Sequence, residues 1–295
     1  MQILAFKYLL AIGAGTVLSI YLLLCLVLLL WQGRLIFVPH LPLERTPATL
    51  GLDYQEVWLP FTTKPDREEK LHGWWLPTGG HKNKVLLYLH GNGSNIGGYL
   101  PQAQLFLQLG FDVFLFDYRG YGRSQGNFPS EKQVYEDAER AFKYLVEQRG
   151  IEPEAIFVYG FSLGGAIAIE LATHHPEIPA LIIQGSFTSL QKMSNYRHWY
   201  FRFLPINLLL RHKFDSLSKI QSLSMPLLLI HGDSDRTVPA YMSQVLSDAA
   251  TSPKQLWFVP DAAHNDVATV AGEKYLQKIR EFLQLVDAQR TRVKT

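Results

Sequence analysis

AIFVYGFSLGG, residues 155–165, is an apolar run that leads directly into a G-x-S-x-G motif. Its first residues are β-formers, and the helical pattern that follows ends at Pro176. Glycines on either side of a serine allow a sharp strand-to-helix turn, which exposes the serine hydroxyl above the sheet. The stretch therefore predicts that Ser162 is a nucleophile. The alternative is an ordinary turn serine that caps the following helix.

Short apolar runs like this one recur along the chain, with helical patterns between most of them. They cover residues 85–90, 113–117, 155–160, 181–185, 226–231 and 255–259. Strands that alternate with helices favour an α/β fold, in which a mostly parallel central sheet carries helices on both faces. Residues 54–61 and 70–77 come first without a helix between them, so we expect them to pair antiparallel.

An acid and a base for Ser162 are available later in the chain. GDSDRTVP (residues 232–239) follows the run at 226–231, and DAAHND (residues 261–266) follows the last predicted strand. We predict His264 as the catalytic base, because a loop beyond a sheet strand can carry an imidazole to the serine. Asp235 is our predicted triad acid, since its distance from the strand end leaves enough loop to turn toward His264. Asp233 is the alternative acid, and we expect it to cap the turn instead.

HGNG, residues 90–93, follows another apolar strand pattern. Such a loop can bring a backbone N–H to the oxyanion of a tetrahedral intermediate, and we predict the amide of Asn92 for this role. The second predicted donor is the N–H of Leu163, the residue after the nucleophile. A glycine-rich phosphate cradle is the alternative, but the loop lacks the lysine of a P-loop. His90 is expected to be structural. No H-x-x-x-H pair occurs, so we expect no catalytic metal.

Residues 8–31 (YLLAIGAGTVLSIYLLLCLVLLLW) are 24 residues without a charge. As a helix they would be ~36 Å long, enough to cross a ~30 Å hydrocarbon core. We predict a single-pass membrane anchor at residues 1–33. A cleaved signal peptide and a buried core helix are the alternatives. The amino terminus and Lys7 on one side against Arg34 and Arg45 on the other leave the side of the membrane undecided.

No chemical motif lies in residues 1–33, so we expect their deletion to leave hydrolysis of a water-soluble ester intact. Residues 34–53 contain three prolines and are expected to form an irregular tether, with the catalytic domain at 54–290. The balance of 28 basic against 26 acidic residues argues against a nucleic-acid partner. The single cysteine, Cys25, excludes an intramolecular disulfide.

Residues 186–225, which we call the cap segment, are longer than an ordinary connection between sheet strands. We expect them to cover the nucleophile and to form a pocket for an acyl chain. The alternative is a sheet-packing helix with a few exposed aromatic residues. The apolar residues expected to line the pocket are Trp199, Tyr200, Phe201, Phe203, Leu204, Ile206, Leu208, Leu209 and Leu210.

With Ser162, Asp235 and His264 in this order, the chain resembles the α/β-hydrolase superfamily. Three further stretches make the resemblance more specific: HGNG at 90–93, DYRGYGRS at 117–124 and HGDSDRTVP at 231–239. They look like the membrane-anchored serine hydrolases of the α/β-hydrolase-domain-13 and -17 type, also grouped with serine-aminopeptidase-like hydrolases. The resemblance spans residues 54–288. The chain lacks the N-terminal cysteine cluster of the type-17 group, so its anchor is closer to the type-13 arrangement.

This resemblance implies an eight-stranded sheet, a Ser-His-Asp triad and no cofactor. It also implies hydrolysis of an acyl bond, and it supports Asp235 as the acid. We therefore expect a serine hydrolase that cleaves an ester or thioester of a small-molecule or lipid-derived acyl substrate through an acyl-enzyme. The alternatives are an aminopeptidase-like amide hydrolase, an acyltransferase, and a non-catalytic binding scaffold.

Overall fold

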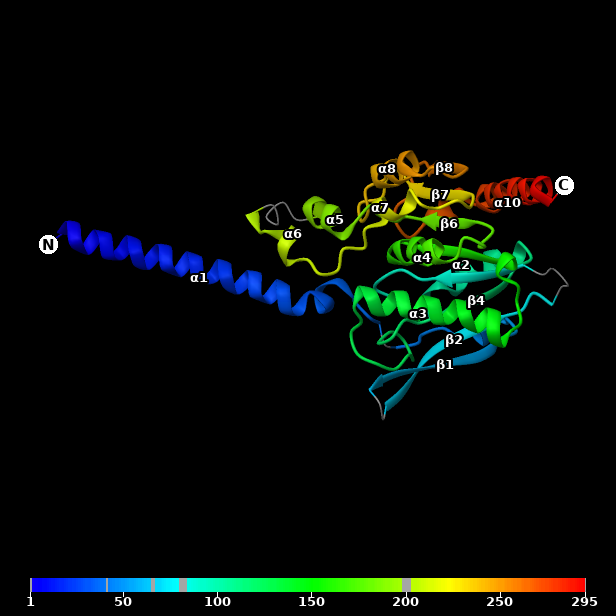
Figure 1. Ribbon diagram of the computed structural model, residues 1–295, viewed down its shortest axis with the longest axis horizontal. Coiled ribbons are helices and arrows are strands. Elements are labelled where there is room, and N and C mark those ends of the chain that lie inside the picture. The colour runs from blue at the N-terminus through cyan, green and yellow to red at the C-terminus, as the bar shows by residue number, and fades with distance from the viewer. Residues whose placement is uncertain (1, 41, 65–66, 80–83, 198–202, 295) are drawn as a thin grey trace.

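The computed structural model describes residues 2–40, 42–64, 67–79, 84–197 and 203–294. Within these residues an eight-stranded sheet forms the centre of the fold, in the order β1-β2-β4-β3-β5-β6-β7-β8 (Figure 1). The strands are β1 (Gln55–Lys64), β2 (Arg67–Leu76), β3 (Val85–Leu89), β4 (Asp112–Phe116), β5 (Ile156–Phe161), β6 (Leu181–Gln184), β7 (Leu227–Gly232) and β8 (Lys254–Val259).

The first two strands pair antiparallel, as the sequence predicts, and β2 also runs antiparallel to β4. All other neighbours in the sheet are parallel. Since parallel strands end at the same edge, the loops that follow β3, β5, β7 and β8 meet beyond one edge of the sheet.

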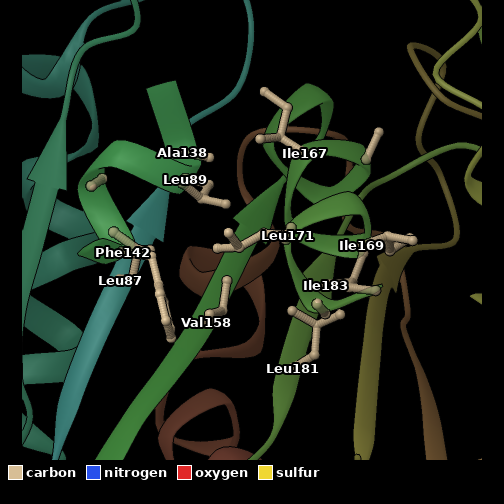
Figure 2. Close-up of a cluster of buried hydrophobic side chains, with 14 of the residues drawn as sticks. Leu87, Leu89, Ala138, Phe142, Val158, Ile167, Ile169, Leu171, Leu181 and Ile183 are labelled. Atoms are coloured by element: carbon tan, nitrogen blue, oxygen red, sulfur yellow. The ribbon is translucent and has the colours of Figure 1, made fainter. Parts of the chain in front are cut away.

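The helices are α1 (Gln2–Ile36), α2 (Ile96–Gln108), α3 (Glu131–Lys143), α4 (Leu163–His174), α5 (Leu190–Arg197), α6 (Ile206–Leu209), α7 (Ser216–Ile220), α8 (Tyr241–Ala249), α9 (Val267–Ala271) and α10 (Glu273–Lys294). Two buried clusters show how they cover the sheet. One joins α3, α4, α7 and α8 to side chains such as Leu87 and Val158, and the other joins α2, α9 and α10 to the alternate residues Leu86 and Phe157. Figure 2 shows the first cluster, where Phe142 of α3 and Leu171 of α4 pack near the strands.

The long first helix extends away from the rest of the fold (Figure 1). It is long and apolar enough to cross a membrane, with a mean hydropathy of 2.5 over its most apolar window. It continues through Ile36, three residues into the segment expected to be an irregular tether. The cap segment contains α5, α6 and α7, and α5 and α6 lie on the side of the sheet from which α1 extends.

Candidate active site

Ser162 lies at a strained turn between β5 and α4. Its φ of 52° and ψ of −114° are unusual for a residue with a side chain. The flanking glycines make this turn possible: a Cβ at Gly160 would collide with the Gly164 carbonyl, and a Cβ at Gly164 would collide with the Leu89 carbonyl. The backbone N–H of Ser162 donates to the Gln184 carbonyl at 2.9 Å, which fixes the turn on β6.

Three polar side chains from separate loops form one hydrogen-bonded line. Nε2 of His264 lies 3.1 Å from Ser162 Oγ, and its Nδ1 lies 2.6 Å from Asp235 Oδ2. These distances are within hydrogen-bond range for a nucleophile and its base. The second carboxylate oxygen, Oδ1, accepts the backbone N–H groups of Thr237 and Val238 at 2.7 and 2.9 Å. The carboxylate is therefore held from both sides in an orientation that faces His264.

Asp235 stays ionised despite its burial. Burial alone raises the pKa of this carboxyl, but hydrogen bonds from His231, His264 and the Val238 amide outweigh that effect and hold the pKa below its ordinary value. His231 reaches the carboxylate through Nε2, 3.2 Å from Oδ2. Its Nδ1 is 2.6 Å from Ser243 Oγ, so His231 is fixed on α8 as a support for the acid.

Asp233 has a different position. It is exposed, and its Oδ1 accepts the backbone N–H of Asp261 at 2.8 Å and the hydroxyl of Ser234 at 3.1 Å. These contacts tie the loop after β7 to the loop after β8. The structure thus brings Asp235, and not Asp233, to His264.

The loop after β3 rests on buried polar groups. His90 is fully buried, with Nδ1 2.7 Å from the Gly91 carbonyl and Nε2 3.5 Å from Asp117 Oδ1. Burial lowers the pKa of His90 to about 4 and raises the pKa of Asp117 to about 8. Both groups are therefore uncharged at neutral pH, and Asp117 accepts the Ile96 amide at the start of α2. Among the described residues, no hydrogen bond joins His90 to Ser162.

The Asn92 side chain forms hydrogen bonds with the backbone at the end of α1 and directly after it. Its Nδ2 donates to the Ile36 carbonyl at 2.6 Å, while Oδ1 accepts the Val38 amide at 2.9 Å and the Tyr121 hydroxyl at 2.6 Å. The sequence predicts a role only for the Asn92 backbone, and no sequence signal indicates these side-chain contacts. Asn92 and Leu163 both line the same cavity as Ser162.

This cavity has a volume of about 760 Å³ and contains Ser162 and His264 in its wall. The cap segment supplies much of its apolar lining, from Phe187, Leu190, Met193, Ile206, Leu209 and Leu210. Among the described residues that line it, none is Asp, Glu, Lys or Arg. The volume is within the ~300–1,000 Å³ usual for small-molecule sites.

The cap residues expected to line the pocket divide into three groups. Ile206, Leu209 and Leu210 do line it. Phe203, Leu204 and Leu208 lie outside the lining, and Phe203 and Leu208 are 63% and 84% exposed. Trp199, Tyr200 and Phe201 lie outside the residues that the structure describes.

The end of α1 forms another wall of the cavity, through Leu28, Gln32, Leu35 and Ile36. The sequence shows no chemical motif in residues 1–33, but the structure places the end of α1 at the cavity. A possible signal was Gln32, the first polar side chain after the uncharged run. A polar residue at that point is expected to find a partner in the protein.

No group of three or more His, Cys, Asp or Glu residues that could hold a metal ion occurs in the described part of the chain. What the site offers is a hydroxyl, an imidazole and a carboxylate in line beside an apolar cavity.

Comparisons with known proteins agree with this architecture. The family model described as serine aminopeptidase, S33, matches residues 80–215. The α/β hydrolase domain-containing protein WAV2 of Arabidopsis thaliana is 30% identical over 278 residues, which cover 87% of this chain and 89% of that protein. The chain belongs to the α/β-hydrolase superfamily. We therefore interpret the site as that of an S33-type α/β hydrolase.

Two further relatives of this hydrolase support the match. Protein bem46 of Schizosaccharomyces pombe is 33% identical over 243 residues, covering 81% of this chain and 79% of that protein. Among solved structures, the esterase Pf2001 of Pyrococcus furiosus superimposes with a TM-score of 0.69 at 28% identity, over 84% of this chain and 98% of that one.

Proposed function

We propose that this α/β hydrolase is a membrane-anchored serine hydrolase that cleaves a carboxylic ester or thioester of an apolar acyl group. The observation that carries the proposal is the hydrogen-bonded line from Ser162 through His264 to Asp235, which opens into an apolar cavity. The likeness to the Pyrococcus furiosus esterase adds support for ester chemistry.

In the proposed mechanism, His264 accepts the hydroxyl proton of Ser162 while Oγ attacks the acyl carbon. The backbone N–H groups of Asn92 and Leu163 hold the resulting oxyanion, and the N-terminus of α4 favours the same negative charge. Asp235 fixes the imidazole through Nδ1 and stabilises its protonated form. His264 then returns the proton to the leaving alcohol or thiol, and water cleaves the acyl-enzyme.

The lining of the cavity favours an acyl substrate over a peptide. An aminopeptidase must bind a charged substrate ammonium, and removing that charge from water without a carboxylate partner is costly. No carboxylate lies among the described residues of the lining. An aliphatic chain, in contrast, gains about 0.8 kcal/mol for each CH₂ that it buries.

The test of the chemistry is labelling with a fluorophosphonate probe, combined with hydrolysis of p-nitrophenyl acetate. Ser162→Ala is expected to abolish labelling and to lower kcat by roughly 10⁴–10⁶. Undiminished labelling of the variant would contradict the assignment of the nucleophile. Release of the acyl group to an added alcohol in preference to water would identify an acyltransferase.

The membrane part of the proposal rests on the length and hydropathy of α1. Its test is extraction of membranes with alkaline carbonate, after which the full-length chain is expected to stay with the lipid. Appearance of the chain in the supernatant would contradict anchoring.

A further inference from the structure

The side of α1 that faces the cavity continues into the apolar part of the helix. Cys25, Leu28, Leu29 and Gln32 are partly or fully covered, as is Val27 on another side of the helix, whereas Leu30 is 61% exposed. Cys25, Leu28, Leu29 and Gln32 recur at helical spacing and so form one helix face. Leu28 and Gln32 of this face line the cavity. The wall of the cavity is thus built partly by the helix that is proposed to cross the membrane.

Gln32 joins this helix to the cap segment. It is 6% exposed, and its Oε1 accepts the backbone amides of Arg211 and His212 at 2.7 and 3.2 Å. Its Nε2 donates to the Leu209 carbonyl at 3.2 Å. A side chain that satisfies three backbone groups of one partner segment holds that segment in a fixed register. The two segments therefore form the cavity wall as a unit.

Charged residues flank the uncharged stretches of both segments. On α1 the uncharged stretch ends before Arg34, and in the cap segment the uncharged residues 203–210 lie between Arg202 and Arg211. Gln32 lies beside both ends. Charged side chains that flank apolar segments mark the membrane–water boundary. If α1 crosses the membrane, this boundary passes close to Gln32.

From Gln32 the cap segment extends back along α1. The Tyr21 hydroxyl donates to the Phe203 carbonyl at 3.4 Å. Tyr21 is ten residues before Trp31, or ~15 Å along the helix. The apolar side chains of Phe203, beside Tyr21, and of Leu208, next to the Leu209 that Gln32 binds, are 63% and 84% exposed. Lipid, rather than water, is the favourable surrounding for such a surface.

We propose, on the basis of the serine-hydrolase function above, that the cavity takes its substrate directly from the bilayer. The substrate class is an uncharged lipid ester with a single long acyl chain, of the monoacylglycerol type. Its chain lies between α1 and the cap segment, and its ester reaches Ser162 at the membrane surface. Uncharged lipid fits because the described lining carries no Lys or Arg to bind a phosphate group.

The experiment uses the full-length chain in phosphatidylcholine vesicles that contain 1-monooleoylglycerol, with oleate release as the readout. Leu28→Trp and Leu209→Trp place bulk in the cavity wall. Leu30→Trp and Leu208→Trp are the matched controls on the same two helices, since neither side chain lines the cavity. Hydrolysis of p-nitrophenyl acetate and fluorophosphonate labelling of Ser162 are measured on every variant.

For the two cavity variants we expect the ratio of oleate release to acetate hydrolysis to fall about tenfold or more. The two controls are expected to keep the parent ratio. Equal ratios in all four variants would overturn the proposal. If a Trp variant loses labelling altogether, Leu28→Ala replaces it, and the same ratio is then expected to fall because the wall loses its contact with the chain.

Two outcomes separate this inference from the function on which it rests. A chain that is labelled and cleaves acetate, but leaves monooleoylglycerol intact, overturns only the lipid substrate. If it instead cleaves a palmitoyl-cysteine peptide in the same vesicles, the occupant is the acyl chain of a protein. A chain that is neither labelled nor active on acetate overturns the serine-hydrolase function itself.

Discussion

The side-chain amide of Asn92 donates a hydrogen bond of 2.6 Å to the carbonyl of Ile36, and so joins the loop after β3 to the last residue of α1. Its Oδ1 accepts the backbone amide of Val38, two residues after the end of α1. The same loop is proposed to supply an oxyanion donor. The position of that donor therefore depends on where α1 ends.

We expect Asn92→Ala to lower kcat/KM on p-nitrophenyl acetate by roughly tenfold, because the backbone donor remains but loses its support. Labelling of Ser162 should persist at a reduced rate. Tyr121→Phe is the control, since it removes only one of the bonds to Asn92 Oδ1 and should have a smaller effect. Equal losses in the two variants would show that the contacts to α1 are unimportant for the loop.

The acid of the triad can be tested by two matched substitutions. Asp235→Asn keeps an oxygen for the Thr237 and Val238 amides, so the loop should fold, but it no longer stabilises a protonated His264. A loss of roughly 10³–10⁴ in kcat is expected. Asp233→Asn should change kcat less than about threefold, because Asp233 contacts only the neighbouring loop. A larger loss for Asp233→Asn than for Asp235→Asn would contradict the assignment.

The buried Asp117 gives the fold a pH dependence of known sign. Its folded pKa of about 8 is above the ordinary value of 3.8, so its contribution to stability is full below about pH 4 and is lost as pH rises through about 8. His90 acts in the opposite sense, since its folded pKa of about 4 is below 6.5 and stability is lost as pH falls through that range.

Asp117→Asn should therefore remove the loss at alkaline pH while keeping an oxygen for the Ile96 amide. We expect the Tm of the variant, relative to the parent, to rise between pH 6.5 and pH 8. This window avoids most of the titration of His90. Thermal unfolding in one detergent at both pH values measures the difference, and a difference independent of pH would contradict the burial argument.

Much of the site could be predicted because its signals are local or follow from sheet geometry. Gly160 and Gly164 each lie two residues from Ser162, and the structure explains both, because a Cβ at either position would collide with a backbone carbonyl. The loops that carry Asp235 and His264 each follow a parallel strand, so they meet at one edge of the sheet. Pattern alone was enough to bring the three residues together.

The contribution of α1 could not be predicted in this way. A single amide at the end of an apolar run does not indicate which backbone will satisfy it, and Gln32 finds its partner at Leu209, 177 residues later. The exposure of Phe203 is a related case. Composition marks the cap segment as apolar, but only the packing decides which apolar residues face the cavity and which face outward.

The separation of cap residues that line the cavity from those that face outward changes which residues should control the choice of acyl chain. We expect kcat/KM to rise from acetyl to octanoyl p-nitrophenyl esters, because burial of four of the six added methylenes would contribute ~3 kcal/mol, or roughly a hundredfold. Met193→Ala should reduce this rise, since Met193 lines the cavity. Phe203→Ala is the control and should leave the profile unchanged, because Phe203 is exposed and outside the lining. A flat profile in the parent chain would contradict an acyl pocket and favour small polar substrates.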